Sequence, residues 1–241
     1  MSFDDAQSVG ALDIWAHDAD ELNGTATEDE LLALLQQADL SHETIEQLSK
    51  SEAARKSRKV KLAIVCHAKT PRYVSLATLR QLFTFDLMQV ALTPAVAGDL
   101  KKAAEEALIN RLESMTLGER LSLARRASGR IAGTLLSDPE VRVIQEALEN
   151  PRLTEVLIIR ALNRDGTPAL VQAICHHSKW SLRREIRIAL LRNQHTPAVH
   201  VIEFARDLPA SMLEDILHVS RLPENLKLQI RQLCKLHWHS H

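Results

Sequence analysis

Histidine and cysteine are the residues whose types and spacing in this chain come closest to a chemical site. The segment CHHSKW places His176 and His177 directly after Cys175. The segment CKLHWHSH near the C-terminus contributes one cysteine and three histidines: Cys234, His237, His239 and His241. Thiolate and neutral imidazole are common zinc ligands, but adjacent residues of a helix point in different directions, and a terminal tail is usually solvated. We therefore predict no structural metal and no cofactor.

Paired carboxylates are the second group that could do chemistry, because two acids can act as general acid and base. They occur at Glu105–Glu106 and at Glu214–Asp215. Neighbouring residues of a helix do not face each other, so we expect both pairs to lie on solvated faces. The chain also contains none of the patterns G-x-x-x-x-G-K-[ST], G-x-G-x-x-G, H-E-x-x-H or G-x-S-x-G. We predict that the protein is not an enzyme, and we assign it no catalytic residue.

The composition indicates an all-α fold as the framework that positions these residues. Of the 241 residues, 45% are apolar and 3% are aromatic, with seven glycines and eight prolines. Such a composition favours helices over strands and is sufficient to bury a core. The cysteines form no C-x-x-C pair and lie within apolar helical patterns, so we expect buried free thiols at Cys66, Cys175 and Cys234.

Membrane and secretion signals are missing from the sequence. No run of eighteen apolar residues occurs, and the N-terminal segment MSFDDAQSVGALDIW lacks the basic and then apolar regions of a secretion signal. We expect a soluble, cytoplasmic protein without a membrane partner.

The near-neutral net charge of -1 conceals an uneven distribution along the chain. Residues 1–50 hold twelve acidic residues and a single basic one, Lys50, whereas the remaining residues hold 29 basic against 19 acidic. We predict three segments: an acidic arm at 1–27, a helical domain at 28–236 and a His-rich tail at 237–241.

A recurring step of one aliphatic and one basic residue indicates internal repetition. The segments KVKLAIVCHAKTP (59–71) and EIRIALLRNQHTP (185–197) share it, and it opens an amphipathic run each time. Five of these steps are separated by 40, 41, 45 and 40 residues: Val60-Lys61, Leu100-Lys101, Val141-Arg142, Ile186-Arg187 and Leu226-Lys227. Intervals of this size are typical of stacked helical units. We therefore predict five phased helices that lie side by side.

Further helices are predicted from their start signals. Three Thr-Pro pairs, at Thr70, Thr167 and Thr196, place a capping hydroxyl before a proline in the first helical turn. The expected helices span 28–38, 41–49, 54–68, 71–82, 85–92, 98–114, 118–135, 139–149, 153–163, 168–177, 181–193, 197–206, 209–219 and 223–236.

The segment LLSDPEVRVIQEAL resembles the second helix of a HEAT repeat, with Asp138 at the cap and Pro139 opening the helix before Val141 and Arg142. The resemblance implies an all-α, right-handed superhelix of about five HEAT- or armadillo-like units over residues 28–236. Such a fold presents an extended surface along its length, which suits the binding of a partner.

If the phased helices line the concave side, as the second helices of HEAT units do, their basic residues form a discontinuous ridge: Lys61, Lys101, Arg142, Arg187 and Lys227. We predict a non-enzymatic scaffold that binds an acidic protein partner through this ridge, which the acidic arm can also cover. The alternative is a nucleic-acid-binding solenoid, with base-repair activity like that of HEAT-like DNA glycosylases. The sequence does not indicate an oligomeric state.

Overall fold

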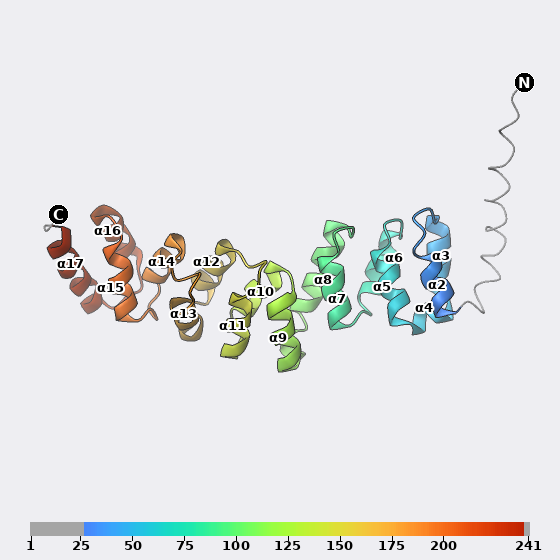
Figure 1. Cartoon of the computed structure of the whole chain (residues 1–241), viewed down its shortest axis with the longest axis horizontal. Helices are drawn as coiled ribbons and strands as arrows, with labels where there is room; N and C mark the ends of the chain where they lie inside the picture. The colour runs from blue at the N-terminus through green and yellow to red at the C-terminus, as the bar shows by residue number, and fades with distance from the viewer. Residues whose placement is uncertain (1–26, 239–241) are drawn as a thin grey trace, which may run out of the picture. The chain divides into compact units, whose positions relative to one another are not determined.

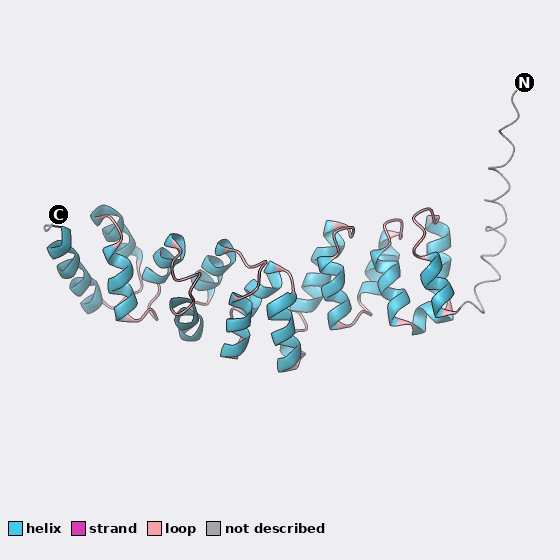
Figure 2. Cartoon of the chain, viewed as in Figure 1, coloured by secondary structure: helices cyan, strands magenta, loops and turns pink. Residues whose placement is uncertain are grey.

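The computed structural model describes the backbone of residues 27–238 and the side chains of residues 27–233. Sixteen α-helices and one 3-10 turn make up this part of the chain, and the described residues contain no strand (Figure 2). The predicted all-α class is therefore confirmed. Most of the predicted acidic arm, residues 1–26, and the end of the predicted tail, residues 239–241, lie outside the described residues.

The chain divides into two compact units at Arg111 and Leu112. The first unit contains seven described helices: α2 (Glu28–Leu34), α3 (His42–Lys50), α4 (Glu52–Lys56), α5 (Arg58–Cys66), α6 (Arg72–Leu79), α7 (Thr84–Leu92) and α8 (Gly98–Ile109). The second unit opens with the 3-10 turn Leu112–Ser114. Its described helices are α9 (Leu117–Arg126), α10 (Gly129–Leu135), α11 (Val141–Leu148), α12 (Glu155–Arg164), α13 (Pro168–Cys175), α14 (Arg184–Leu191), α15 (Ala198–Arg206), α16 (Ala210–Val219) and α17 (Glu224–Trp238).

Serine and threonine start many of these helices by accepting a backbone N–H. Ser41, Ser51 and Ser57 each cap a helix of the first unit in this way. Thr27 and Thr116 form complete capping boxes with a glutamate three residues later. The split of the predicted helix 54–68 into α4 and α5 follows from Ser57, because its hydroxyl caps a new helix where the sequence pattern suggested a continuous one.

The helices of each unit pack in alternating layers. In the first unit α5 packs on α7 and α6 packs on α8, while α5 with α6 and α7 with α8 connect the two layers. In the second unit α11 packs on both α9 and α13, and the other layer runs through α10, α12, α14 and α16 (Figure 1). α15 packs on α14 and α17. Every helix therefore buries one face against neighbours close to it in sequence.

The buried residues follow the helical period that the sequence showed. In the first unit Ile45, Val60 and Ile64 are fully or almost fully buried in one cluster with residues of α2. In the second unit Ile144 and Leu190 are completely buried, which agrees with the predicted apolar faces of their helices.

The predicted helix 118–135 is broken into α9 and α10 by Ala127 and Ser128. The buried Asn150 side chain donates to the carbonyls of Ala124 and Ala127, at 2.7 and 3.2 Å, and so satisfies the end of α9. Gly129 is the first residue of α10 and lies against the Arg152 carbonyl, which leaves no room for a Cβ atom. The break therefore depends on residues that lie more than twenty positions away in sequence.

The five phased helices do not form a stack of neighbours, so that prediction is wrong. Each phased step does fall at the first or third residue of a helix: α5, α8, α11, α14 and α17. Each interval of about 40 residues, however, advances the chain by three helices, and the layers alternate with every helix. α5 and α8 consequently lie in different layers of the first unit, and α11 and α14 in different layers of the second.

Hydrogen bonds between helix pairs show the shorter spacing that the structure uses. Arg58 donates to Asp86, 28 residues later, with 2.6 Å between Nε and Oδ2. Arg111 donates to the carbonyl of Leu82, 29 residues earlier, and Asn150 to that of Ala124, 26 residues earlier. Contacts at this separation join one pair of helices to the next.

Candidate functional site

The two predicted ridge residues of the first unit are partly buried and lie on different layers. The Lys101 Nζ donates to the carbonyl of Pro94 at 3.1 Å. Lys61 lines a hollow of about 270 Å³ together with Lys50, Arg55 and Tyr73. The Tyr73 hydroxyl faces the Glu46 carboxylate, and this hydrogen bond raises the pKa of the phenol. The structure therefore does not bring Lys61 and Lys101 together.

The three predicted ridge residues of the second unit have three different environments. Arg142 is exposed, whereas Lys227 is 8% exposed and its Nζ lies 2.8 Å from Glu224 Oε1. The Lys227 ammonium lowers the pKa of the Glu224 carboxyl. Arg187 is engaged in a network of its own. Their partner-binding role stays a prediction.

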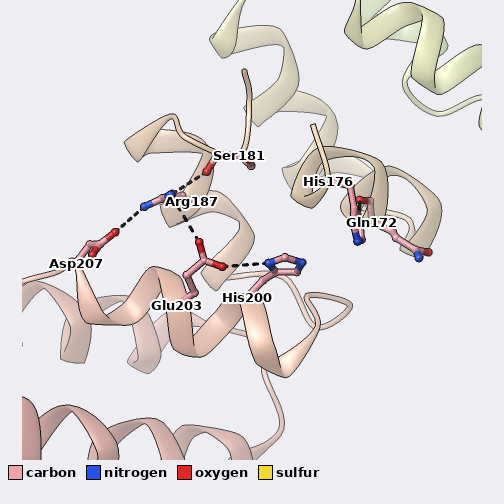
Figure 3. A network of polar contacts seen from close by, with 7 residues as sticks. All are labelled: Gln172, His176, Ser181, Arg187, His200, Glu203 and Asp207. Atoms are coloured by element: carbon pink, nitrogen blue, oxygen red, sulfur yellow. Dashed lines mark hydrogen bonds and ion pairs between the residues drawn. The ribbon is translucent and has the colours of Figure 1, made fainter. Parts of the chain in front are cut away.

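Arg187 uses its donors within the chain, as Figure 3 shows. Its Nε donates to the Ser181 carbonyl at 2.7 Å, and its Nη1 lies 2.6 Å from Asp207 Oδ2. The guanidinium also lies 5.0 Å above the centre of the Phe204 ring and 4.0 Å from a Glu203 oxygen. A guanidinium bound on so many sides joins α14 to α15. It leaves little donor capacity for a partner.

The histidines predicted as possible metal ligands have structural contacts. His176 Nδ1 lies 2.8 Å from the carbonyl of Gln172, and its ring packs edge-on against His200, with 5.5 Å between the ring centres (Figure 3). The His177 Nε2 lies 3.3 Å from a Glu149 oxygen. Among the described residues no three His, Cys, Asp or Glu side chains are arranged to hold a metal ion. Cys234 and the tail histidines lie outside the described side chains.

Cys66 and Cys175 are free thiols; Cys175 is buried as predicted, whereas Cys66 is only partly buried. Cys175 is 6% exposed, and burial together with the nearby Glu203 carboxylate raises the pKa of its thiol to about 11. Burial also raises the pKa of the Cys66 thiol, which is partly exposed. Thiols with a raised pKa are poor nucleophiles near neutral pH.

The Glu214–Asp215 pair is exposed, as predicted, whereas in the other pair Glu106 is exposed and Glu105 is partly buried. Glu214 is exposed and forms an ion pair with Arg231, with 2.9 Å between Oε2 and Nε. Trp180 is 3% exposed, and its indole Nε1 donates to the Leu148 carbonyl at 2.8 Å. Trp180 therefore packs locally.

Arg142 belongs to a cationic hollow between α9 and α11, which we call the α9–α11 hollow. It has a volume of about 310 Å³ and is lined by Leu121, Ser122, Arg125, Arg126, Arg142, Gln145 and Glu146. Arg125 lies 3.9 Å from the single carboxylate of this lining, Glu146. Within the described part of the chain, neither Arg126 nor Arg142 has a carboxylate within ion-pair distance. Two of the three cations are therefore available to a ligand.

A second cationic hollow lies where α12, α14 and α16 end, and we call it the arginine basin. It has a volume of about 320 Å³ and is lined by Leu162, Asn163, Arg164, Asp165, Gly166, Ala189, Arg192, Asn193, Gln194, His195, Val219 and Arg221. None of its arginines was among the predicted site residues. The signal in the sequence is the separation of 28 residues between Arg164 and Arg192 and of 29 between Arg192 and Arg221.

Comparison with known proteins adds no family assignment. No family model matches the chain, and neither the curated proteins nor the solved structures compared with it gave a match. Across residues 27–238, no helix combines the length and the apolar character needed to cross a membrane.

Proposed function

We propose that this protein is a non-enzymatic helical-repeat scaffold that binds an acidic protein partner. The observation that carries the proposal is the α9–α11 hollow, in which Arg126 and Arg142 face solvent without a carboxylate partner. Unpaired cations beside a concave surface attract carboxylates and raise the rate of encounter with an acidic partner.

The helical framework supports this function. Each unit consists of layered helices whose successive pairs are joined by hydrogen bonds between residues about 28 positions apart. We propose that the arrangement is a right-handed superhelix similar in plan to HEAT and armadillo arrays, with a two-helix unit shorter than the one expected from the sequence. Such arrays bind partners along an extended surface rather than in an enclosed pocket.

We propose different roles for the predicted basic residues. Arg187 and Lys227 have carboxylate partners in their own unit, which supports a role within the scaffold rather than in the interface. Arg142 has none and is the member of the predicted ridge that we place in the interface. Lys61 lines its own hollow in the first unit and offers a second contact of the same kind.

The test compares an acidic peptide with nucleic acid. The affinity of the full chain for a labelled polyglutamate peptide is measured by fluorescence anisotropy at low and at moderate salt. The same measurement is made with a labelled single-stranded oligonucleotide of equal charge. We expect the peptide to bind, Arg126→Glu with Arg142→Glu to weaken it by about tenfold or more, and added salt to weaken it further. The control is Arg206→Glu, which reverses an exposed arginine of α15 outside both hollows and is compared with Arg126→Glu and Arg142→Glu taken singly, because each of these changes the net charge by the same amount.

Two outcomes would contradict the proposal. One is binding of the oligonucleotide but not of the peptide, which would favour the nucleic-acid alternative. The other is equal weakening by the Arg206 control, which would show that only the total charge of the chain matters.

A further inference from the structure

We infer that the arginine basin is a second docking site, for a short segment of a protein partner that carries adjacent acidic residues beside an apolar one. The inference rests on the proposed function, because it names the chemistry of a segment that the scaffold would bind. It concerns a surface formed by different helices from those of the α9–α11 hollow.

The basin lies on a ladder of residues that follow successive helices of one layer. Ser137, Asp165, Asn193 and Arg221 come after α10, α12, α14 and α16, and each lies 28 residues after the one before. The Ser137 hydroxyl donates to Asp165 Oδ2 at 2.6 Å, Asn193 Nδ2 donates to the Gly166 carbonyl at 3.1 Å, and the Arg221 N–H donates to the Arg192 carbonyl at 3.0 Å. These bonds fix the backbone from which the arginines project.

The three arginines of the basin differ in their charge balance. Arg164 Nε lies 2.6 Å from Asp165 Oδ2, and its Nη2 donates to the Ser137 hydroxyl at 2.8 Å. The hydrogen bond from the Ser137 hydroxyl and, after it, the one from Arg164 lower the pKa of the Asp165 carboxyl, which therefore stays ionised and balances Arg164. Within the described residues no carboxylate lies within ion-pair distance of Arg192 or Arg221, and both are exposed. Two positive charges of the basin are therefore uncompensated.

Two small residues, Gly166 and Ala189, belong to the lining of the basin. Gly166 is buried, has a φ of 41° and lies against the Asn193 side chain, which leaves no space for a Cβ atom. Val219, 60% exposed, adds an apolar surface next to Arg221. A carboxylate between the two arginines and an apolar side chain on Val219 would use all of these features.

The position of the charges favours an acidic peptide over a nucleic acid. A phosphate backbone needs several uncompensated cations in succession. Along this ladder the two free arginines are followed, toward α10, by the neutralised pair Arg164 and Asp165 and then by the uncharged Ser137. The uncompensated positive charge is therefore limited to Arg192 and Arg221, a stretch that a short peptide segment can span.

The experiment uses the full chain and a fluorescein-labelled peptide with two adjacent glutamates followed by valine. The comparison peptide has glutamine in place of glutamate, and inorganic phosphate and a short single-stranded oligonucleotide are tested as competitors. We expect the glutamate peptide to bind and Arg192→Glu with Arg221→Glu to weaken it by about tenfold or more. Arg206→Glu on α15 serves as the matched control for the single variants Arg192→Glu and Arg221→Glu, because each of the three changes the net charge by the same amount.

A variant with the opposite expected effect separates a binding role from a structural one. Asp165→Asn keeps an acceptor for Ser137 but removes the charge that balances Arg164. This variant should bind the glutamate peptide about threefold or more tightly than the natural chain, because a third cation becomes available.

The outcomes decide between the two hollows. Unchanged peptide binding in the Arg192 and Arg221 double variant would overturn the basin as a docking site. If Arg126→Glu with Arg142→Glu still weakened polyglutamate binding, the proposed function would stand without it. Efficient competition by the oligonucleotide or by phosphate, or weaker binding in Asp165→Asn, would also overturn the inference.

Discussion

Thr70 and Thr196, 126 residues apart, make the same hydrogen bond. Each hydroxyl donates, at 2.6 Å, to the carbonyl of the residue six positions earlier, Ile64 and Leu190. Each bond closes the turn after one helix and precedes a proline that caps the next. This shared turn accounts for the likeness of the segments 59–71 and 185–197.

The Thr196 bond is buried, so its loss should be measurable. Thr196 is 5% exposed, and Thr196→Val leaves the Leu190 carbonyl without this donor. We expect the free energy of unfolding to fall by about 1 to 2 kcal/mol in urea titrations. Thr70→Val should cost less, because Thr70 is only partly buried. Thr154→Val is the control, since Thr154 is exposed and its hydroxyl caps no N–H. An equal loss in that variant would refute the assigned role.

Gly166 should not tolerate a side chain. Its positive φ disfavours any other residue, and a Cβ atom would collide with the Asn193 amide and the Leu162 carbonyl. We expect Gly166→Ala to lower the free energy of unfolding by about 2 kcal/mol or more. Gly118→Ala is the matched control, because no atom lies within 4 Å of the Cβ position in α9, and it should be neutral or stabilising. Thermal denaturation of both variants provides the comparison.

Leu190 tests the core face of α14. The residue is completely buried, so Leu190→Ala should cost about 2 to 5 kcal/mol, and Leu190→Asp should unfold the surrounding helices. Leu182→Ala removes a leucine that is 69% exposed and should change stability by no more than about 0.5 kcal/mol. Circular dichroism during urea unfolding measures both effects. A native-like midpoint for Leu190→Asp would contradict the register of α14.

The thiol of Cys175 should resist alkylation in the folded protein. Its pKa is raised from 9.0 to about 11, so near pH 8 its thiolate is about a hundredfold rarer than that of an unperturbed thiol. We expect iodoacetamide to label Cys175 much more slowly in buffer than in urea, as followed by mass spectrometry. The folded state binds the Cys175 proton more tightly than the unfolded state does. The protonated thiol therefore contributes fully to the free energy of unfolding below pH 9, and this contribution is lost as the pH rises toward 11. Rapid labelling in buffer would show that the site opens frequently.

The positions of most helices could be predicted from the sequence, because apolar period and capping residues are local signals. The prediction placed α11, α13 and α15 within a few residues. Thr167 caps α13 as expected, with Pro168 in the first turn. The same prediction was wrong for Thr70 and Thr196, because the proline after each is the N-cap residue of the next helix. Asp138 was expected to cap α11, but it accepts from the N–H of Glu140 in the turn before that helix.

The order of packing could not be predicted in the same way, because the turns that repeat in space differ in sequence. In the described part of the chain five turn residues accept a hydrogen bond from the backbone N–H two positions later: His67, Asp138, Asn150, His177 and Asn193. A histidine nitrogen and an asparagine oxygen can both accept this hydrogen bond. A comparison of residue types therefore does not reveal that the same turn recurs. The break at Ala127 was missed for a related reason, since Asn150, which stabilises it, belongs to a later turn.

The arginine basin illustrates the same limit for function. Arg192 and Arg221 belong to none of the five phased steps, and their common surface depends on the ladder that runs through Asn193. Arg187, in contrast, was predicted as a site residue because it belongs to a phased step, yet its guanidinium forms an ion pair with Asp207. Which cation is free is decided by neighbours on other helices.

Hydrogen bonds that reach only about 28 residues along the chain also have a mechanical consequence. When a unit of this kind is pulled from its ends, the load passes through each pair of helices in turn, since no bond described here ties a distant part of the chain across the intervening pairs. We expect such a unit to lengthen at low force as one pair of helices unfolds at a time. When the force is released, the pairs refold one after another, so the extension is elastic.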